Sequence, residues 1–507
     1  MKKNWRKPIG IFLKWLGLYN MIAAQKRALH YRSYTRWVRT CESKNGPKVS
    51  ESVLFSIVVP THKYTAHYLE PLIDSVIAQD YPKWELILVN ACSSEADANA
   101  VNRAAQRDPR IKEVRLKENL HISGNTNAGI GAAIGDYISF LDHDDLLASF
   151  ALSEMAAVLA KSDDVDVFYS DEDKVADDGT GRTYAFFKPD FDPELILTSN
   201  YICHFLTARS TLVKEVGGLR PDFDGAQDYD LILRLLDHNP IIHHIPRMSY
   251  HWRMAESSTA VGFSDKSYAS EAGRKALEES VARQEIKAEV IPIEGQQTAY
   301  RLKYEIPPDL RIALVAPDLK TPLRAGVTLI SQVEATKSAD QYDVIAYLKA
   351  GITPLRADWL DELAGRAFQP DVGVVSAAVV NHRGVSPQGY VQTKIGLKLL
   401  EGNVLYPEFS YMGASSWPRT FSVVPDGCYA LKGSLVGRGD RSFVELCVHL
   451  SQKGLRNVFW SYSVVKNQSA EFPPGLDLLP GAEPVIRDPY FNANLTINNH
   501  QAVPELS

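Results

Sequence analysis

Cysteine is scarce in this chain, with five among 507 residues, and no two of them form a C-x-x-C pair. This spacing excludes a disulfide framework and a zinc site, and it predicts reduced thiols in a cytosolic protein. No apolar run reaches 18 residues, so we expect no membrane-spanning helix. The net charge of −6 argues against a general nucleic-acid binder. What remains is an ordinary globular composition, and a length that predicts two or three domains.

Acidic residues are missing from the first forty positions, which hold ten Lys or Arg. Lys14 interrupts the apolar cluster at 9–19 and no small-residue cleavage site follows, so we do not expect a signal peptide. Such a basic segment can lie in the headgroup layer of an anionic membrane, or it can be a helix packed on its own domain. The membrane alternative is slightly favoured, which predicts a cytoplasmic protein, peripheral on the inner face of the cytoplasmic membrane.

Short apolar runs alternate with helical stretches after residue 54. Buried strands are expected at 55–60, 84–90, 111–116 and 136–141. This alternation predicts an α/β fold, with a mostly parallel sheet and helices on both faces. Ligands of such sheets bind at the carboxyl ends of the strands.

Three carboxylates follow the fourth expected strand at that edge, on Asp142, Asp144 and Asp145. Carboxylates this close repel one another beside an apolar wall unless a cation lies among them. Mg²⁺ and Mn²⁺ take oxygen ligands and share their coordination shell with substrate phosphates. The segment lacks the longer ligand run of an EF-hand, so a calcium cage is not expected. A metal shared with a diphosphate is favoured over a solvated acidic loop.

An ordered set of motifs spans about residues 54–262: strand ends in Pro-Thr and Asn, a Gly- and Asn-rich helix start, then LDHDD, YSDEDK, GAQDYD and YHWR. This order resembles the family-2 glycosyltransferases, which have the inverting GT-A (nucleotide-diphospho-sugar transferase) fold, and among them bacterial O-antigen and rhamnan-type polysaccharide transferases. The resemblance implies metal-dependent transfer of a sugar, with inversion, from a nucleotide-diphosphate donor to a polysaccharide or lipid-linked glycan acceptor.

The resemblance also implies a metal site. Asp142 and Asp144 would be the motif acids and Asp145 a further ligand, holding Mg²⁺ or Mn²⁺ against the donor diphosphate. His251 is placed like the metal-ligand histidine of GT-A enzymes, although a lone histidine is more often structural. Arg253 would bind phosphate oxygens.

The general base implied by the resemblance is Asp228, in GAQDYD, which would take the proton from the attacking acceptor hydroxyl. The alternative is a helix N-cap, since a helix is expected to follow directly. Asp230 is expected to support the site or cap that helix.

The nucleotide-sugar contacts implied by the resemblance form a longer set. Many family members end the second strand with Asp-Asp, where this chain has Asn90 and Ala91. An asparagine can still pair with a pyrimidine edge, so both a TDP-sugar such as TDP-rhamnose and a UDP-sugar stay open. The expected contacts come from Pro60, Thr61, Tyr64, Asn90, Asn127, Asp142 and Arg253.

The acids of YSDEDK are Asp171, Glu172 and Asp173. The resemblance places them near the acceptor or the donor sugar. A solvated acidic loop is the alternative for at least one of the three.

A second α/β unit is expected from 307 to 470, and it too resembles a family-2 module. The positions of the acidic pair are held by Ala350 and Gly351, and the position of the base by Phe443. We therefore expect a degenerate copy that serves as a stabilising partner, an acceptor-binding surface or a dimer interface, so a homo-oligomer stays open. The other expected divisions are a basic helical region at 1–50, the catalytic domain at 51–306, and a Pro- and Asn-rich tail at 471–507 that is extended or partly disordered.

Two other functions compete with the transferase. A nucleotidyltransferase would need a Gly-rich basic loop after the first strand, and PTHKYTAHYLEP is not one. A catalytically inactive pseudo-glycosyltransferase scaffold would not need Asp142, Asp144 and Asp228 together.

Overall fold

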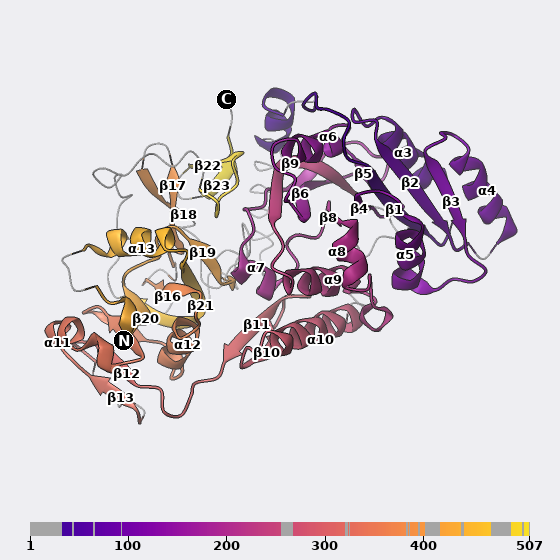
Figure 1. The fold of residues 1–507 in the computed structure, drawn as a ribbon. Helices are drawn as coiled ribbons and strands as arrows, with labels where there is room; N and C mark the ends of the chain where they lie inside the picture. The colour runs from indigo at the N-terminus through magenta and orange to yellow at the C-terminus, as the bar shows by residue number, and fades with distance from the viewer. Residues whose placement is uncertain are drawn as a thin grey trace, which may run out of the picture.

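The computed structural model describes residues 33–42, 45–63, 66–92, 94–254, 267–319, 323, 325–381, 384, 386–393, 396–400, 416–437, 441–467, 488–498 and 501–505. These residues form two α/β domains, each built around one large sheet (Figure 1). Among the described residues, no helix combines the length and the apolar character needed to cross a bilayer. The predicted membrane-surface segment lies largely outside the described residues, as its first 32 positions are not among them.

The first sheet has the strand order β3-β2-β1-β4-β8-β6-β9-β5, with β7 paired to β6. It is parallel from β3 to β4, whereas β8 is antiparallel to both of its neighbours. The α/β class is confirmed, but the sheet is mixed beyond β4. Its strands are β1 (Phe55–Thr61), β2 (Trp84–Asn90), β3 (Ile111–Arg115), β4 (Tyr137–Phe140), β5 (Leu146–Leu147), β6 (Val167–Val175), β7 (Thr183–Phe186), β8 (Thr207–Arg209) and β9 (Ile242–Arg253).

Successive side chains of the central strands point to opposite faces of this sheet, so the apolar core is divided between the two faces. Val58 packs in one apolar cluster, while Ile57 and Val59 pack in another. Because both faces are covered by helices, these strands are apolar throughout, and each fully buried aliphatic side chain contributes about 1.5–3 kcal/mol. The helices are α3 (Ala66–Ile77), α4 (Glu95–Ala105), α5 (His121–Ala132), α6 (Ala151–Leu159), α7 (Pro193–Thr198), α8 (Ser210–Glu215) and α9 (Gln227–Leu236).

The Gly-rich helix α5 lies close against the sheet. A Cβ atom at Gly129 would meet a side-chain carbon of Val58 at 2.4 Å and one of Val89 at 2.9 Å. Real Cβ contacts are longer, so glycine at this position lets α5 approach the two central strands. That approach brings the start of α5 to the carboxyl edge of the sheet.

The second sheet repeats the arrangement of the first, with the order β13-β12-β14-β20-β16-β21-β15 and β19 paired to β21. From β12 to β15 each neighbouring pair has the same relative direction as its counterpart from β1 to β5. The helices and strands of the second domain are β12 (Ile312–Val315), β13 (Val327–Leu329), α11 (Gln332–Lys337), β14 (Val344–Leu348), β15 (Ile352–Pro354), α12 (Trp359–Ala367), β16 (Val372–Val380), β17 (Gly389–Thr393), β18 (Gly396–Leu400), β19 (Arg419–Phe421), β20 (Cys428–Lys432), α13 (Phe443–Gln452) and β21 (Arg456–Asn467).

A helix and a hairpin connect the two domains along the lower edge of Figure 1. Helix α10 (Ser267–Arg283) packs on α9, and the hairpin of β10 (Ala288–Pro292) and β11 (Tyr300–Tyr304) leads to the second sheet. Arg301 of β11 forms an ion pair with the buried Glu362 of α12. The connection is therefore packed against both domains.

A buried charge cluster joins the domains directly. Glu194 of α7 pairs with Arg366 of α12 and with Arg456 of β21, and the side chains of Glu194 and Arg366 are each only 2% exposed. Asp192 accepts hydrogen bonds from the backbone N–H and the hydroxyl of Thr420, at 2.9 and 2.8 Å. Buried charges need such partners, so these contacts fix how the two domains meet.

The described part of the C-terminal tail does not fit an extended or disordered arm. Strands β22 (Leu495–Asn498) and β23 (Gln501–Pro504) pair in antiparallel fashion. Asn492 is buried, and its amide donates to the carboxylate of Asp171 and to the carbonyl of Lys188. The composition of the tail is misleading here because its buried polar groups have partners in the first domain.

Candidate functional site

A pocket opens at the carboxyl ends of β1 and β4, where the starts of α5 and α9 also meet. This is the edge at which a parallel sheet places its ligands. Asp142 follows β4, Asp228 is the second residue of α9, and both line the pocket. The full lining is Val58, Pro60, Ile122, Thr126, Phe140, Leu141, Asp142, Cys203, His204, Leu206, Leu219, Gln227, Asp228 and Leu231.

Asp142, Asp145 and His204 form a group that could hold a metal ion. One ligand atom of each lies within 4.8 Å of the others. Asp145 is buried and accepts hydrogen bonds from the Tyr250 hydroxyl and from the Arg253 backbone N–H, the latter at 2.8 Å. Burial, and next the charge of Asp142, raises the pKa of Asp145 well above its usual range. A cation would relieve that cost.

Asp144 is not part of this group, although the sequence predicted it as a ligand. It is partly buried, and burial raises the pKa of its carboxyl group.

Sequence reasoning missed His204 because no motif surrounds it. Its ring stacks on Tyr250, with centroids 4.3 Å apart, and its Nδ1 lies 3.2 Å from Glu172. Glu172 in turn pairs at 2.9 Å with Lys188, whose side chain is fully buried. Burial opposes the charge of Glu172, but Lys188 and His204 outweigh it and lower the pKa of Glu172 to about 2. The ionised Glu172 fixes the orientation of the ring.

His251, the predicted metal ligand, has a different partner. Its Nδ1 lies 2.6 Å from Asp173, which also accepts hydrogen bonds from Tyr34 and Arg182. The structure brings His204, not His251, to Asp142 and Asp145. The reason is topological: β9 presents His251 toward Asp173 of the paired strand β6.

The acids of YSDEDK lie inside β6 and are all buried, so a solvated acidic loop is wrong for each of them. Asp171 accepts from Asn492 and lies 2.8 Å from His244 Nε2. Glu172 and Asp173 have the histidine partners described above. The three carboxylates are engaged within the protein, and none of them lines the pocket.

Asp228 is not a helix cap. Ala226 occupies the N-cap of α9, so that alternative is wrong. The Asp228 Oδ2 atom accepts a hydrogen bond from Asn200 at 2.9 Å. Burial raises the pKa of Asp228, and the nearby Asp142 raises it further. Asp230, which is expected to support the site or cap this helix, pairs with Arg220 and with Arg234 of the same helix.

Two buried groups near the acidic turn have donors without partners. Arg253 donates to the carbonyl of His67 at 2.8 Å, but its Nε and Nη2 have no partner among the described residues. The hydroxyl of Thr61 is likewise unpaired there. Buried donors are nearly always satisfied, so these unpaired donors favour an anionic or polar ligand. Pro60 lines the pocket, and Tyr64 lies outside the described residues.

Asn90 and Asn127 do not offer their amides to a nucleotide. Asn90 is buried and donates to the carbonyl of Ala98 at 2.9 Å and to Glu113 at 2.6 Å. Asn127 exchanges two hydrogen bonds with the backbone of Leu219, at 2.7 and 2.8 Å. Both amides are consumed in holding the strands and loops around the pocket.

Part of the chain matches a known protein family, and longer stretches of it are similar to two relatives. Residues 56–217 match the family model described as Glycosyl transferase family 2. An uncharacterized protein, y4gI, of Sinorhizobium fredii is 31% identical over 82% of this chain and 52% of its own length. The O-antigen biosynthesis protein RfbC of Myxococcus xanthus is 29% identical over 89% of this chain and 41% of its own. The chain spans about half the length or less of these relatives.

Among solved structures, Staphylococcus aureus TarS in complex with UDP-GlcNAc is 21% identical, covers 44% of this chain and 65% of its own, and has a TM-score of 0.36. The mannosyltransferase PcManGT of Pyrobaculum calidifontis, in complex with GDP-Man and Mn²⁺, is 18% identical over 50% of this chain and 72% of its own, with a TM-score of 0.36. At these scores, residue roles are not transferred.

The mixed sheet, its ligand edge and the acidic turn after β4 define a GT-A fold, followed by a second α/β domain. Within the first domain, residues 56–217 match the model of glycosyltransferase family 2.

Proposed function

We propose that the chain is an inverting, metal-dependent glycosyltransferase that moves a sugar from a nucleotide-diphosphate donor to a surface polysaccharide. The observation that carries the proposal is that Asp228 lines the same pocket as Asp142 and His204. A carboxylate with a raised pKa then lies across one pocket from a candidate metal group. The O-antigen function named for the RfbC relative supports a polysaccharide acceptor. A TDP- or a UDP-sugar is the proposed donor.

The residues present fit a divalent cation. Two carboxylates and an imidazole suit Mn²⁺, and Mg²⁺ would rely more on the oxygen ligands. Asp142, Asp145 and His204 would hold the ion, which when bound supplies a Lewis acid for the leaving diphosphate. The raised pKa of Asp145 supports this fit because a cation is what would favour its charged form.

The chain's own groups would carry out the remaining chemistry. Asp228 accepts the proton of the acceptor hydroxyl as its oxygen bonds to the anomeric carbon. The bond from that carbon to the diphosphate oxygen breaks on the opposite face, so the configuration inverts without a covalent intermediate. Arg253 offers its Nε and Nη2 donors, which have no partner in the described part of the chain, to phosphate oxygens.

The direct test is a panel of nucleotide sugars assayed for hydrolysis and for transfer, with Mn²⁺, with Mg²⁺ and with EDTA. We expect one donor to turn over with metal and to stop in EDTA. Metal-independent turnover would contradict the metal role, and binding without any turnover would favour a scaffold.

Glu172→Gln should weaken Mn²⁺ binding by about 10–100-fold, because the orientation of a metal-bound histidine depends on its hydrogen-bond partner. Glu172 is a positioning residue, acting through His204 at 3.2 Å. Binding is measured from the electron paramagnetic resonance signal of free Mn²⁺. Glu289→Gln, at an exposed position of β10, is the matched control. Equal Mn²⁺ affinity in the two variants would show that Glu172 does not position His204 for metal binding.

The acceptor is proposed to be lipid-linked, with the basic residues within 1–40 binding the inner face of the cytoplasmic membrane. Each basic residue near an anionic surface contributes about 1 kcal/mol. The full chain should sediment with vesicles containing phosphatidylglycerol at low salt, and a chain that lacks residues 1–32 should remain in the supernatant. Sedimentation of both would place the membrane contact elsewhere.

A further inference from the structure

A second cleft lies in the second domain, at the carboxyl ends of β12 and β14. Its empty volume, counting the part open to solvent, is about 1400 Å³, against about 570 Å³ for the first-domain pocket. It is the larger of the two clefts. Its lining is Val315, Ala316, Pro317, Leu329, Ile330, Ser331, Gln332, Tyr347, Leu348, Lys349, Ala350 and Tyr429.

The strand register shows that this cleft is the structural counterpart, in the second domain, of the proposed donor pocket in the first. Val58 pairs with Phe140 in the first sheet, and Val315 pairs with Tyr347 in the second. Counting on from these pairs matches six lining positions of the two clefts: Val58, Pro60, Phe140, Leu141, Asp142 and Leu206 correspond to Val315, Pro317, Tyr347, Leu348, Lys349 and Tyr429.

One of these exchanges reverses the charge. Lys349, and not the predicted Ala350, stands where the first domain has Asp142, because the strand register shifts that equivalence by one residue. The link from β14 to β15 is Lys349 to Gly351, with no acid. This cleft cannot repeat the metal group of the first domain. Lys349 pairs with Asp426, but both side chains are more than 40% exposed, and such pairs contribute about 0–1 kcal/mol. A ligand can therefore compete for the ammonium group.

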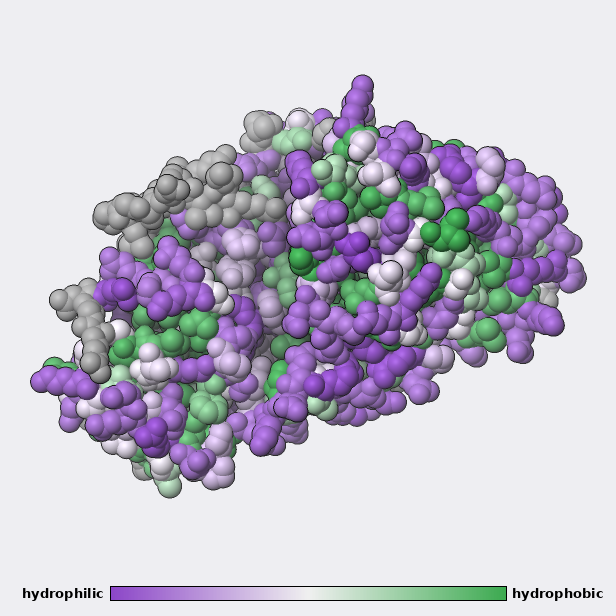
Figure 2. All heavy atoms as spheres, in the orientation of Figure 1, coloured by the Kyte–Doolittle hydropathy of each residue, from purple (hydrophilic) through white to green (hydrophobic). Residues whose placement is uncertain are grey.

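Two other exchanges place tyrosine rings and hydroxyl groups on the floor of the second-domain cleft. Tyr347 and Tyr429 stack with ring centroids 4.7 Å apart, where the first domain has Phe140 and Leu206. No hydrogen bond to either hydroxyl is found among the described residues. Leu329 is 54% exposed at the rim, and Figure 2 shows apolar surface in the region of β12 and β20, set among hydrophilic residues.

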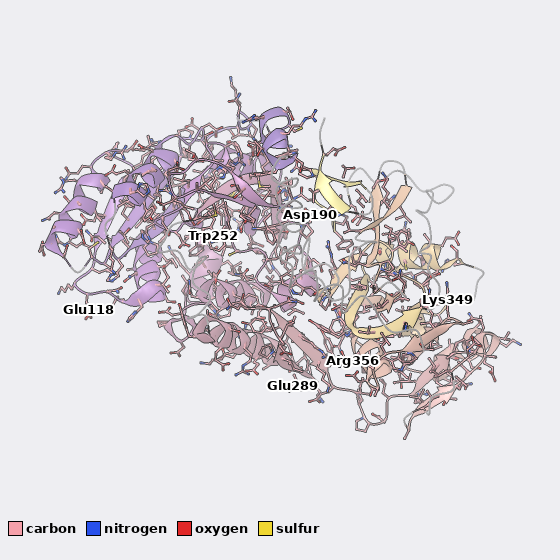
Figure 3. The ribbon with its side chains drawn as sticks, turned by 180° about the vertical axis from the view of Figure 1, so that it is seen from behind. Glu118, Asp190, Trp252, Glu289, Lys349 and Arg356 are labelled. Atoms are coloured by element: carbon pink, nitrogen blue, oxygen red, sulfur yellow. The ribbon has the colours of Figure 1, made fainter. Side chains whose placement is uncertain are left out.

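Tyrosine combines an apolar ring with a hydroxyl, and this pairing suits a sugar, which has C–H faces and many hydroxyl groups. We propose that the second-domain cleft is a metal-independent binding site for a saccharide segment of the polysaccharide acceptor. The inference rests on the proposed function, which supplies the acceptor. Figure 3 shows Lys349 in one domain and Trp252, beside the first pocket, in the other. One long glycan bound at both places gains affinity because the second contact is intramolecular.

The test uses the full chain in EDTA on an array of oligosaccharides from bacterial surface polysaccharides. We expect binding to at least one glycan, weakened about tenfold or more in Tyr347→Phe/Tyr429→Phe, because two hydrogen bonds are lost while both rings stay. Arg356→Met, an exposed cation of the same domain, is the control and should bind like the wild type.

The same variants are then assayed for metal-dependent donor hydrolysis, which should be unchanged because the second cleft is remote from Asp228. Absence of EDTA-resistant glycan binding, or equal binding by the double variant, overturns the inference while leaving the proposed transferase intact. Displacement of bound glycan by UDP or TDP in EDTA would also overturn it, because the cleft would then be a nucleotide site. Absence of metal-dependent donor hydrolysis by the wild-type chain would instead contradict the proposed function.

Discussion

Asp228→Asn should lower sugar transfer by about 10²–10⁴-fold while donor binding is retained, because a general base contributes a factor of this size. The asparagine keeps the shape and can still pair with Asn200, which holds Asp228 Oδ2 at 2.9 Å. It cannot accept the proton of the acceptor hydroxyl. Turnover is measured with the donor found in the nucleotide-sugar panel, and donor affinity by titration calorimetry with Mn²⁺.

Asp222→Asn is the matched control, since Asp222 is an exposed carboxylate six positions away in the same segment. It should transfer sugar at the wild-type rate. If Asp228→Asn also keeps that rate, the base is another group, and if it loses donor binding, Asp228 acts in binding.

The same assignment has a pH signature. An unperturbed aspartate titrates near 3.9, and burial raises the pKa of Asp228. The base must be ionised to work, so kcat/KM should fall as the pH drops through this raised pKa, above the range of an ordinary aspartate. A profile that stays flat down to about pH 4 would contradict it.

Glu194→Gln should lower the free energy of unfolding by about 3–5 kcal/mol, because it leaves the buried Arg366 without its closest charge partner. Glu194 lies in the first domain and pairs with Arg366 and Arg456 of the second. Urea denaturation followed by tryptophan fluorescence measures the loss. Glu271→Gln, which breaks an exposed pair on α10, should change stability by no more than about 0.5 kcal/mol.

The stability contributed by Glu194 depends on pH with a definite sign. Burial opposes its charge, but Arg366 and Arg456 outweigh it and hold the pKa of Glu194 below its usual range. The contribution is therefore present above about pH 4.3, the unfolded value, and is lost as the pH falls through the folded pKa. The difference between wild type and variant should shrink in that direction. A constant difference would mean that Glu194 is not ionised in the folded chain.

Much of the site could be predicted from local sequence. The apolar strands, the acids after β4 and the carboxylate at the start of α9 are local features, and the edge rule of parallel sheets brings them together. Asp142 and Asp145 are predicted in this way, whereas the role of Asp228 is predicted from the resemblance to family-2 glycosyltransferases. The repeat of the fold in the second domain also leaves a local signal, because its strands and helices return in the same order.

The partners of buried polar groups could not be predicted, because they come from distant parts of the chain. His204 is 62 positions from Asp142, and no motif marks it, so His251 of YHWR was assigned in its place. Asn90 lies at the predicted strand end, but its amide is used by Glu113 of the neighbouring strand. The sequence by itself determined the strand ends, the acids at them and the family. Tertiary structure decided which histidine faces the acids and which amides are already paired, because only packing fixes the hydrogen-bond partners of a buried group.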